Sequence, residues 1–100
     1  MISYQLEFTQ AAKADIRHAR LWYNNQRENL GNEFLMEIEK IQNNILANPK
    51  QFAKVRHHIR KAVLKRFPYN LFFVVIRNNI SVIAVFHNSR NPKIWEARMK

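Results

Sequence analysis

The spacing of apolar side chains changes near residue 50, and this change limits the folds that the chain can adopt. Between Thr9 and Pro49 apolar residues recur every three or four positions, which is the spacing of amphipathic helices. From Phe52 onward they alternate with polar residues or form continuous runs, as strands do. Ser3–Phe8 also alternates, so one strand precedes the helical part. The predicted order of elements is therefore β-α-α-β-β-β.

Two amphipathic helices are predicted in the first half. The first follows Thr9, a residue type that caps helix N-termini, and ends near Gln26. The second begins at Leu30 and stops at Asn48-Pro49, because a residue before proline disfavours the helical conformation. The connection is short, so the helices should form an antiparallel hairpin. The predicted apolar faces are Ala12, Ile16, Ala19 and Tyr23, then Leu30, Phe34, Ile38, Ile41 and Ile45, with Glu33, Glu37, Lys40 and Asn44 opposite the second face.

Three strands are predicted in the second half, at Ile59–Phe67, Asn70–Arg77 and Ile80–His87. Asn78-Asn79 suits the positive φ angles of a tight hairpin turn between the last two. Leu71–Ile76 shows almost no alternation, which indicates a central strand buried on both faces. The predicted fold is α+β: an N-terminal strand, a two-helix hairpin and a three-stranded antiparallel meander, with the hairpin on one face of the sheet.

The chain length and composition fit one domain over residues 1–100. There are 100 residues, a single glycine and no cysteine, so disulfides and thiolate metal sites are excluded. The longest apolar stretch is too short to cross a bilayer, and the N-terminus has no pattern of a secretory signal. We expect a cytoplasmic protein with no membrane partner, no metal and no cofactor. A short helix is expected at Asn91–Arg98, with Pro92 in its first turn.

The positive charge lies almost entirely in the second half of the chain. Residues 1–50 carry six basic and six acidic side chains, whereas residues 51–100 carry eleven basic side chains and Glu96 as the single acid. A positive potential concentrated in this way attracts nucleic acid or an acidic protein surface. The simpler interpretation, a charge that only keeps a small domain soluble, does not require this segregation.

Several segments resemble one family when they are taken together. They are Lys65–Phe73, Ile80–His87, Ser89–Pro92, Trp95 and Arg98, preceded by Phe8–Ala12, Asp15-Ile16 and Asn48-Pro49. In this order the chain resembles the RelE/ParE toxin superfamily of type II toxin-antitoxin and plasmid stabilisation systems. The resemblance implies a helical hairpin beside a curved sheet with a basic concavity, and a cognate antitoxin as partner. RelE-like members cleave messenger RNA at the ribosome, whereas ParE-like members poison DNA gyrase, so fold does not settle function.

The candidate residues for chemistry lie in the basic half. Cleavage of RNA beside a 2′-hydroxyl needs a base, a cation for the phosphate and an acid for the leaving oxygen. His87, Arg66 and Arg90 are the candidates for these roles, if the protein is a nuclease. The RelE type of site has a late tyrosine, but the last tyrosine here is Tyr69. The candidates for binding a target or nucleic acid are Arg60, Lys61, Lys65, Arg66, Arg90, Trp95 and Arg98.

Three functions stay open at this stage. The missing tail tyrosine favours a ParE-like toxin that inhibits growth by binding DNA gyrase. A ribosome-dependent mRNA endonuclease that uses His87 is the alternative, and an inactive member that only binds antitoxin or nucleic acid is the third. His87 has a simpler interpretation, a hydrogen bond that closes the last strand, and Arg66 another, a structural contact. The uneven charge predicts that the antitoxin contributes an acidic amphipathic segment.

Overall fold

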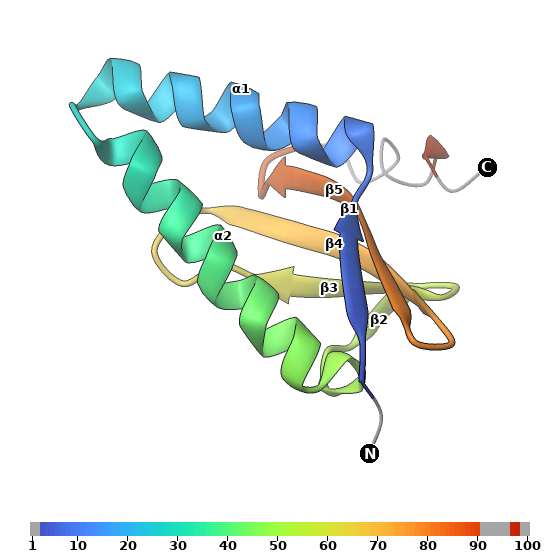
Figure 1. Cartoon of the computed structure of the whole chain (residues 1–100). Helices are drawn as coiled ribbons and strands as arrows, with labels where there is room; N and C mark the ends of the chain where they lie inside the picture. Colours follow the sequence, from blue (N-terminus) through green and yellow to red (C-terminus); the bar gives the residue numbers. More distant parts are fainter. Residues whose placement is uncertain (1–2, 91–96, 99–100) are drawn as a thin grey trace.

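The computed structural model describes residues 3–90 and 97–98, and it has the predicted α+β class, with one strand more than the predicted order of elements (Figure 1). One strand precedes two helices, and the remaining strands follow them. The elements are β1 (Gln5–Phe8), α1 (Gln10–Gln26), α2 (Leu30–Ala47), the short 3-10 helix η1 (Pro49–Gln51), β2 (Lys54–Arg56), β3 (Ile59–Val63), β4 (Tyr69–Ile76) and β5 (Asn79–His87).

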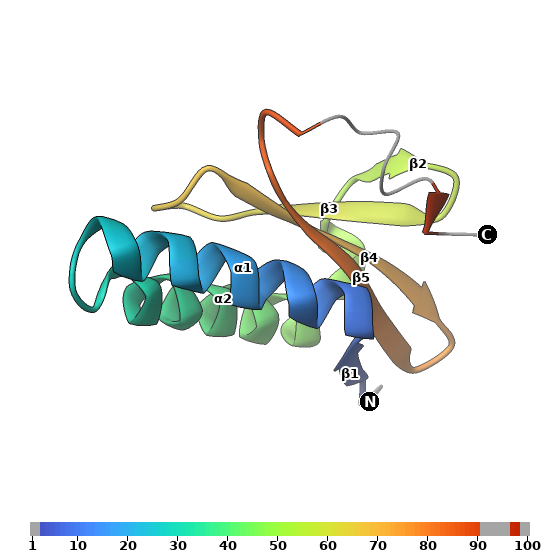
Figure 2. The ribbon, with the colours of Figure 1, turned by 90° about the horizontal axis from the view of Figure 1, so that it is seen from above.

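The helical hairpin forms as the sequence predicts. Thr9 caps α1, since its Oγ1 accepts a hydrogen bond of 3.1 Å from the amide of Ala12. The connection turns through Asn29, which has a left-handed φ of 68°. Gly31 permits close approach of the two helices, because a Cβ there would lie 2.4 Å from the carbonyl oxygen of Arg20. Seen from above, α1 and α2 lie side by side along one face of the sheet (Figure 2).

The sheet has the order β1-β5-β4-β3-β2. Its last four strands are antiparallel neighbours, but β1 pairs parallel to β5, so the sheet is mixed and not purely antiparallel as predicted. The alternation of Ser3–Phe8 could not give this direction, because parallel and antiparallel strands share the same period of two. The parallel ladder continues to the start of α1, where the amide of Thr9 donates to the carbonyl of Val82 at 3.0 Å.

Strand boundaries in the second half differ from the prediction at three places. The additional edge strand β2 was not predicted. The strand expected at Ile59–Phe67 ends at Val63, because Pro68 has no amide hydrogen for a ladder and the chain turns before it. The turn between β4 and β5 is Arg77-Asn78 rather than Asn78-Asn79: Asn79 already pairs with Ile76, and Arg77 has the positive φ, 55°.

The core lies on both faces of the sheet, because β4 is its middle strand and faces alternate along it. Leu71 and Phe73 point into the larger cluster under the helices, whereas Phe72 and Val74 join a smaller cluster on the other face. This confirms the central strand, although its last residue, Ile76, is exposed. The face of the sheet away from the helices is therefore also apolar.

One polar residue of α2 is buried against expectation. Glu37 was placed on the exposed face of the helix, but only 6% of the residue is accessible. Its carboxylate forms an ion pair of 3.1 Å with Lys40, one turn further along. The width of the apolar stripe explains the error, because Glu37 immediately precedes the buried Ile38 and lies at the border of the stripe.

Candidate functional site

The chain leaves β5 through a tight corner formed by residues 87–90. The amide of Arg90 donates to the carbonyl of His87 at 2.9 Å, which closes the turn. The amide of Asn88 donates to the carbonyl of Pro68 at 2.8 Å, and the side chain of Asn70 donates to that of Asn88 at 2.8 Å. These bonds attach the corner to β4 and to the turn before it. The orientation of His87 and Arg90 is thereby fixed relative to the sheet.

His87 uses one ring nitrogen inside the corner. Nδ1 accepts a hydrogen bond of 3.0 Å from the amide of Ser89 and lies 2.9 Å from the hydroxyl of the same residue. Because Nδ1 is an acceptor here, the neutral ring carries its proton on Nε2. The ring also packs edge-on against Tyr69, with 5.3 Å between centroids. In this arrangement His87 offers a donor and no free lone pair for taking up a proton.

Arg90 is stacked on an aromatic ring. Its guanidinium carbon lies 4.1 Å from the centre of the Phe86 ring. Within residues 3–90 and 97–98 no carboxylate forms an ion pair with it. Stacking fixes the plane of the guanidinium without consuming its N–H groups, which can meet a carboxylate or a phosphate in a bidentate manner.

The corner separates two clefts. We call the first the sheet-face cleft: it has a volume of about 260 Å³ and lies on the face of the sheet away from the helices. We call the second the helix-side cleft: it has a volume of about 500 Å³ and lies between α1 and the end of β5. His87 and Arg90 line both. The sheet-face cleft is lined by Val55, Lys61, Asn70, Phe72, Phe86, His87, Asn88 and Arg90.

The sheet-face cleft combines an apolar floor with cations. Phe72 and Phe86 form the floor, with 6.1 Å between their ring centroids. Lys61 stands on one side, and His87 and Arg90 stand on the other. Successive side chains of β3 point to opposite faces of the sheet. Lys61 therefore points into this cleft, whereas its neighbour Arg60 points to the helical face. A planar or apolar group carrying a negative charge fits this arrangement.

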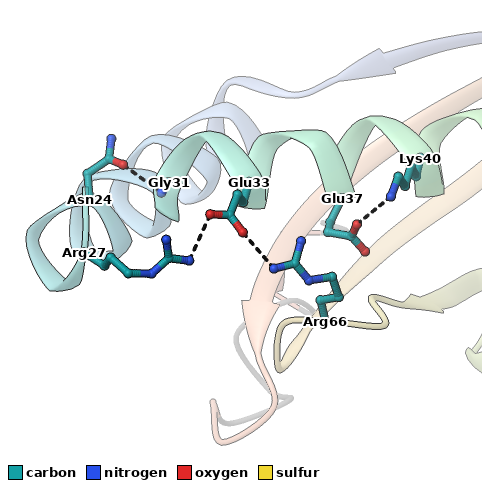
Figure 3. A network of polar contacts seen from close by, with 7 residues as sticks. All are labelled: Asn24, Arg27, Gly31, Glu33, Glu37, Lys40 and Arg66. Atoms are coloured by element: carbon teal, nitrogen blue, oxygen red, sulfur yellow. Dashed lines mark hydrogen bonds and ion pairs between the residues drawn. The ribbon is translucent and has the colours of Figure 1, made fainter. Parts of the chain in front are cut away.

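Arg66 lies elsewhere, on the helical side of the molecule. Its guanidinium forms an ion pair of 2.8 Å with Glu33 of α2, and Arg27 approaches the other oxygen of that carboxylate at 2.9 Å (Figure 3). Hydrogen bonds from Arg66 and Arg27 lower the pKa of Glu33, and the bond to Glu33 raises the pKa of Arg66. Among the side chains that the structure describes, Arg66 lines neither cleft. The structure therefore does not bring Arg66 together with His87 and Arg90.

The other predicted basic residues are divided between structural contacts and the surface. Arg60 donates to the carbonyl oxygens of Phe52, at 2.6 Å, and of Lys50, at 3.3 Å, and so ties β3 to the segment after α2. Lys65 is exposed and lies beside α2. Of Arg60, Lys61 and Lys65, Lys61 is therefore the residue that lines a cleft together with His87 and Arg90. Trp95 and most of the predicted tail helix lie outside the described residues.

Arg98 is bound to Asp15, which was named above among the segments that resemble the family but not as a site residue. Its two terminal nitrogens contact the two carboxylate oxygens at 2.6 and 3.1 Å, and Nη1 also donates to the carbonyl of Ile83 at 3.0 Å. Asp15 accepts a further bond of 3.0 Å from the amide of Val85. In the sequence, Asp15 is a charged residue on the apolar face of α1, which is the sign that could have pointed to this role. These contacts attach Arg98 to α1 and to β5.

Two further observations concern only the described part of the chain. No cluster of three or more histidine, cysteine, aspartate or glutamate side chains there could hold a metal ion. No helix within it is long and apolar enough to span a membrane.

The architecture is the fold of toxins of the RelE/ParE type. Two solved structures share this fold. A protein of the chromosomal ParDE system from P. aeruginosa has a TM-score of 0.76, 18% sequence identity and coverage of 85% of this chain and 96% of that chain. The isolated E. coli RelE toxin has a TM-score of 0.65, 24% identity and 95% coverage of both chains.

The sequence decides between these two branches of the fold. Residues 6–92 match the family model described as "ParE toxin of type II toxin-antitoxin system, parDE". The chain belongs to this ParE toxin family. A comparison with curated proteins gives no match. Membership implies an antitoxin as partner, and it leaves the molecular target to be argued from the geometry of the site.

Proposed function

We propose that this toxin inhibits growth by binding an essential bacterial protein through the sheet-face cleft, and that the target is DNA gyrase. The observation that carries the proposal is the state of His87, whose Nδ1 lone pair is already used by the amide of Ser89. Binding needs only shape and charge, which Lys61 and Arg90 supply. The proposal places the protein in the bacterial cytoplasm, where gyrase acts.

A nuclease makes stronger demands on the same residues. The attack of a 2′-hydroxyl on a phosphate requires a group that accepts its proton and cations that stabilise the crowded phosphate. His87 offers Nε2–H as a donor, and Arg66 is paired with Glu33 on another side of the molecule. The three candidates for catalysis are therefore not assembled. Membership of the ParE family supports the same conclusion.

One observation favours the alternative, a ribosome-dependent mRNA endonuclease. His87, Arg90 and Lys61 line one cleft, and a phosphate would fit among them. For His87 to accept a proton, the Ser89 bond would have to open on the ribosome. The third possibility, a family member that binds only its antitoxin or nucleic acid, predicts no activity against either target.

The proposal is tested by two assays on the same purified protein. We expect inhibition of DNA supercoiling by gyrase, and no new 5′ ends when translated mRNA is examined by primer extension. Arg90→Ala should weaken the inhibition, because within residues 3–90 and 97–98 no carboxylate pairs with this guanidinium. Arg17→Ala, on the exposed surface of α1, serves as the matched control. Cleavage of mRNA without inhibition of gyrase would reject the proposal.

His87→Gln separates the two mechanisms in growing cells. A gyrase-binding toxin needs no titrating group, so the change should cost only contact energy, about 1 kcal/mol, and toxicity should persist. A general acid or base typically contributes roughly 10²- to 10⁴-fold in rate, so a nuclease should lose its toxicity. The measurement is growth inhibition at matched expression, with antitoxin binding as the test of folding. Complete loss of toxicity in a folded variant would favour the nuclease.

A second expectation concerns the antitoxin. The excess charge of residues 51–100 predicts an acidic, amphipathic inhibitory segment. Electrostatic attraction mainly accelerates association, so raising the salt concentration from roughly 50 to 500 mM should slow association more than tenfold. Stopped-flow or surface plasmon resonance measurements over this range test the expectation. An association rate that does not change with salt would argue against an acidic partner.

A further inference from the structure

Two hairpin turns lie at the end of the sheet opposite to the corner. The first, His57-His58, joins β2 to β3, and the second, Arg77-Asn78, joins β4 to β5. Because β3 and β4 are antiparallel neighbours, the start of β3 and the end of β4 lie at one end of the sheet, whereas residues 87–90 follow the strand end at the other. Both views show the two turns at the same end (Figure 1 and Figure 2). This end is therefore separate from the site described above.

The two turns have the same backbone construction. Each is a two-residue turn closed by a pair of strand residues. In each the first turn residue has a positive φ, which is 51° at His57 and 55° at Arg77. This position of a two-residue hairpin turn favours glycine, because a side chain crowds the backbone there.

Neither turn has a residue that adopts this conformation readily. The third positive φ in the described chain belongs to Asn29, and asparagine tolerates it. Asn78 directly follows Arg77, so the second turn contains an asparagine and still has arginine at the strained position. Strained residues of this kind are concentrated at functional sites. The repetition of a basic residue at the same position of both turns indicates that the side chain is needed there.

Basic side chains surround both strained positions. We call the exposed residues Lys54, Arg56, His57, His58 and Arg77 the turn surface. Residues 51–90 contain no aspartate or glutamate, so no acid of this stretch neutralises them. Between the residues that the structure describes, no ion pair includes Lys54 or Arg77. The turn surface therefore carries a concentrated positive charge.

The turn surface has the features that contacts with a phosphate backbone require. Such contacts need cations and N–H donors that project toward the ligand, and they need no hollow. The residues of the turn surface line neither the sheet-face cleft nor the helix-side cleft. A protein interface has an apolar centre that excludes water, whereas the exposed apolar residues at this end, Val55 and Ile76, stand singly in different strands.

We propose that the turn surface binds the phosphate backbone of duplex nucleic acid, with Lys54 and Arg77 as two of its phosphate contacts. The strained turns hold the side chains of His57 and Arg77 outward. Because the cations come from two hairpins, a polymer with regularly spaced phosphates can contact both. The proposal concerns the free toxin, and it is independent of which target the toxin attacks.

The test uses Arg77→Gly, which removes a cation and introduces the residue that the turn prefers. Binding to a fluorescein-labelled DNA duplex of about 20 base pairs is measured by fluorescence anisotropy at salt concentrations from roughly 50 to 200 mM. Each phosphate contact contributes about 0.9 to the steepness with which log K falls against log salt. Arg77→Gly should therefore weaken binding about five- to tenfold and reduce the steepness by about 0.9, and Lys54→Gln/Arg77→Gly should reduce it by about 1.8.

Two control variants separate a local contact from net charge. Arg17→Ala removes one positive charge from the exposed surface of α1 and should leave the salt dependence unchanged. Arg77→Lys keeps the charge at the turn and should keep the salt dependence of the parent. Equal effects of Arg17→Ala and Arg77→Gly would show that only the net charge matters, and the proposal would be overturned.

Thermal melts separate binding from folding. Glycine adopts a positive φ without steric cost, so Arg77→Gly should melt at or above the parent temperature while it loses affinity for DNA. A residue with a purely structural role would lower the melting temperature when it is replaced. A melting temperature well below that of the parent would contradict the strained turn and the proposal that depends on it.

Duplexes of DNA and RNA with the same sequence identify the source of the phosphates. Tighter binding of DNA assigns the surface to DNA at the target, and tighter binding of RNA assigns it to structured RNA, and either result supports the proposal. Poly-L-glutamate is the probe for an acidic protein. If it binds as tightly as the duplexes at equal charge concentration and loses as much affinity with Arg77→Gly, the proposal is overturned.

The outcome is distinguishable from a failure of the gyrase proposal, because duplex binding is measured without gyrase. If the parent protein fails to inhibit supercoiling while Arg77→Gly still lowers duplex binding, the target proposal is wrong and the turn surface stands.

Discussion

Replacing Phe34 by alanine is expected to lower the free energy of unfolding by about 3 to 5 kcal/mol. Phe34 has no accessible surface. Its ring contacts those of Phe67 and Tyr69, at centroid distances of 5.3 and 5.1 Å, and so joins α2 to the turn between β3 and β4. The deletion leaves a cavity that the rigid sheet cannot fill. A loss of this size is a large part of the stability of a 100-residue domain.

The variant should lose its toxicity because the chain unfolds. Urea denaturation followed by circular dichroism measures the change, and Met36→Ala is the matched control, since Met36 lies on the same helix and is 59% exposed. Phe73→Ala, fully buried in the middle strand, should behave like Phe34→Ala. A cooperative melt near the parent temperature would show that the two rings do not support the core as described.

Asp15→Ala is expected to destabilise the protein by about 3 kcal/mol, because it breaks a buried ion pair on one side only. The Asp15 side chain is 7% exposed and that of Arg98 is 22% exposed. Without the carboxylate, Arg98 keeps its charge in a partly buried place, and the amide of Val85 loses its acceptor. Both losses add to the cost.

Two measurements identify the cause of this loss. Hydrogen exchange at the amide of Val85 should accelerate more than exchange elsewhere in β5, because Asp15 is its acceptor. The double variant Asp15→Ala/Arg98→Ala should lose less stability than the sum of the single variants, since the unpaired charge is also removed. Glu39→Ala, an exposed carboxylate of α2, is the control. Strict additivity of the two changes would argue against the pair.

Local patterns were sufficient for most of the fold. The cap at Thr9, the stop at Asn48-Pro49 and the apolar spacing of both helices depend on residues within one or two turns, so the sequence shows them directly. The continuous run in β4 likewise revealed a middle strand buried on both faces. The segregation of charge depends on composition alone. Family resemblance added the class of protein, which the family model then confirmed.

The direction and ends of the strands needed the tertiary structure. β1 runs parallel to β5, although its alternation would fit either direction. β3 stops at Val63 because of the turn before Pro68, and the positive φ predicted for Asn78-Asn79 occurs at Arg77. For β1 the backbone of a distant strand decides the direction, and a pattern of period two carries no information about that strand.

The partners of the charged side chains were also decided only in three dimensions. The family resemblance and the predicted strands placed Arg66, His87 and Arg90 together near the C-terminal end of the sheet. In the structure Arg66 instead pairs with Glu33, and Arg98 pairs with Asp15, which lies 83 positions away in the sequence. The sequence thus determined which ionisable groups the toxin has, whereas the packing of α1 and α2 on the sheet determined which of them are neutralised. Arg90 lies at the junction of two clefts, stacked on Phe86, and has no carboxylate partner in the part of the chain that the structure describes.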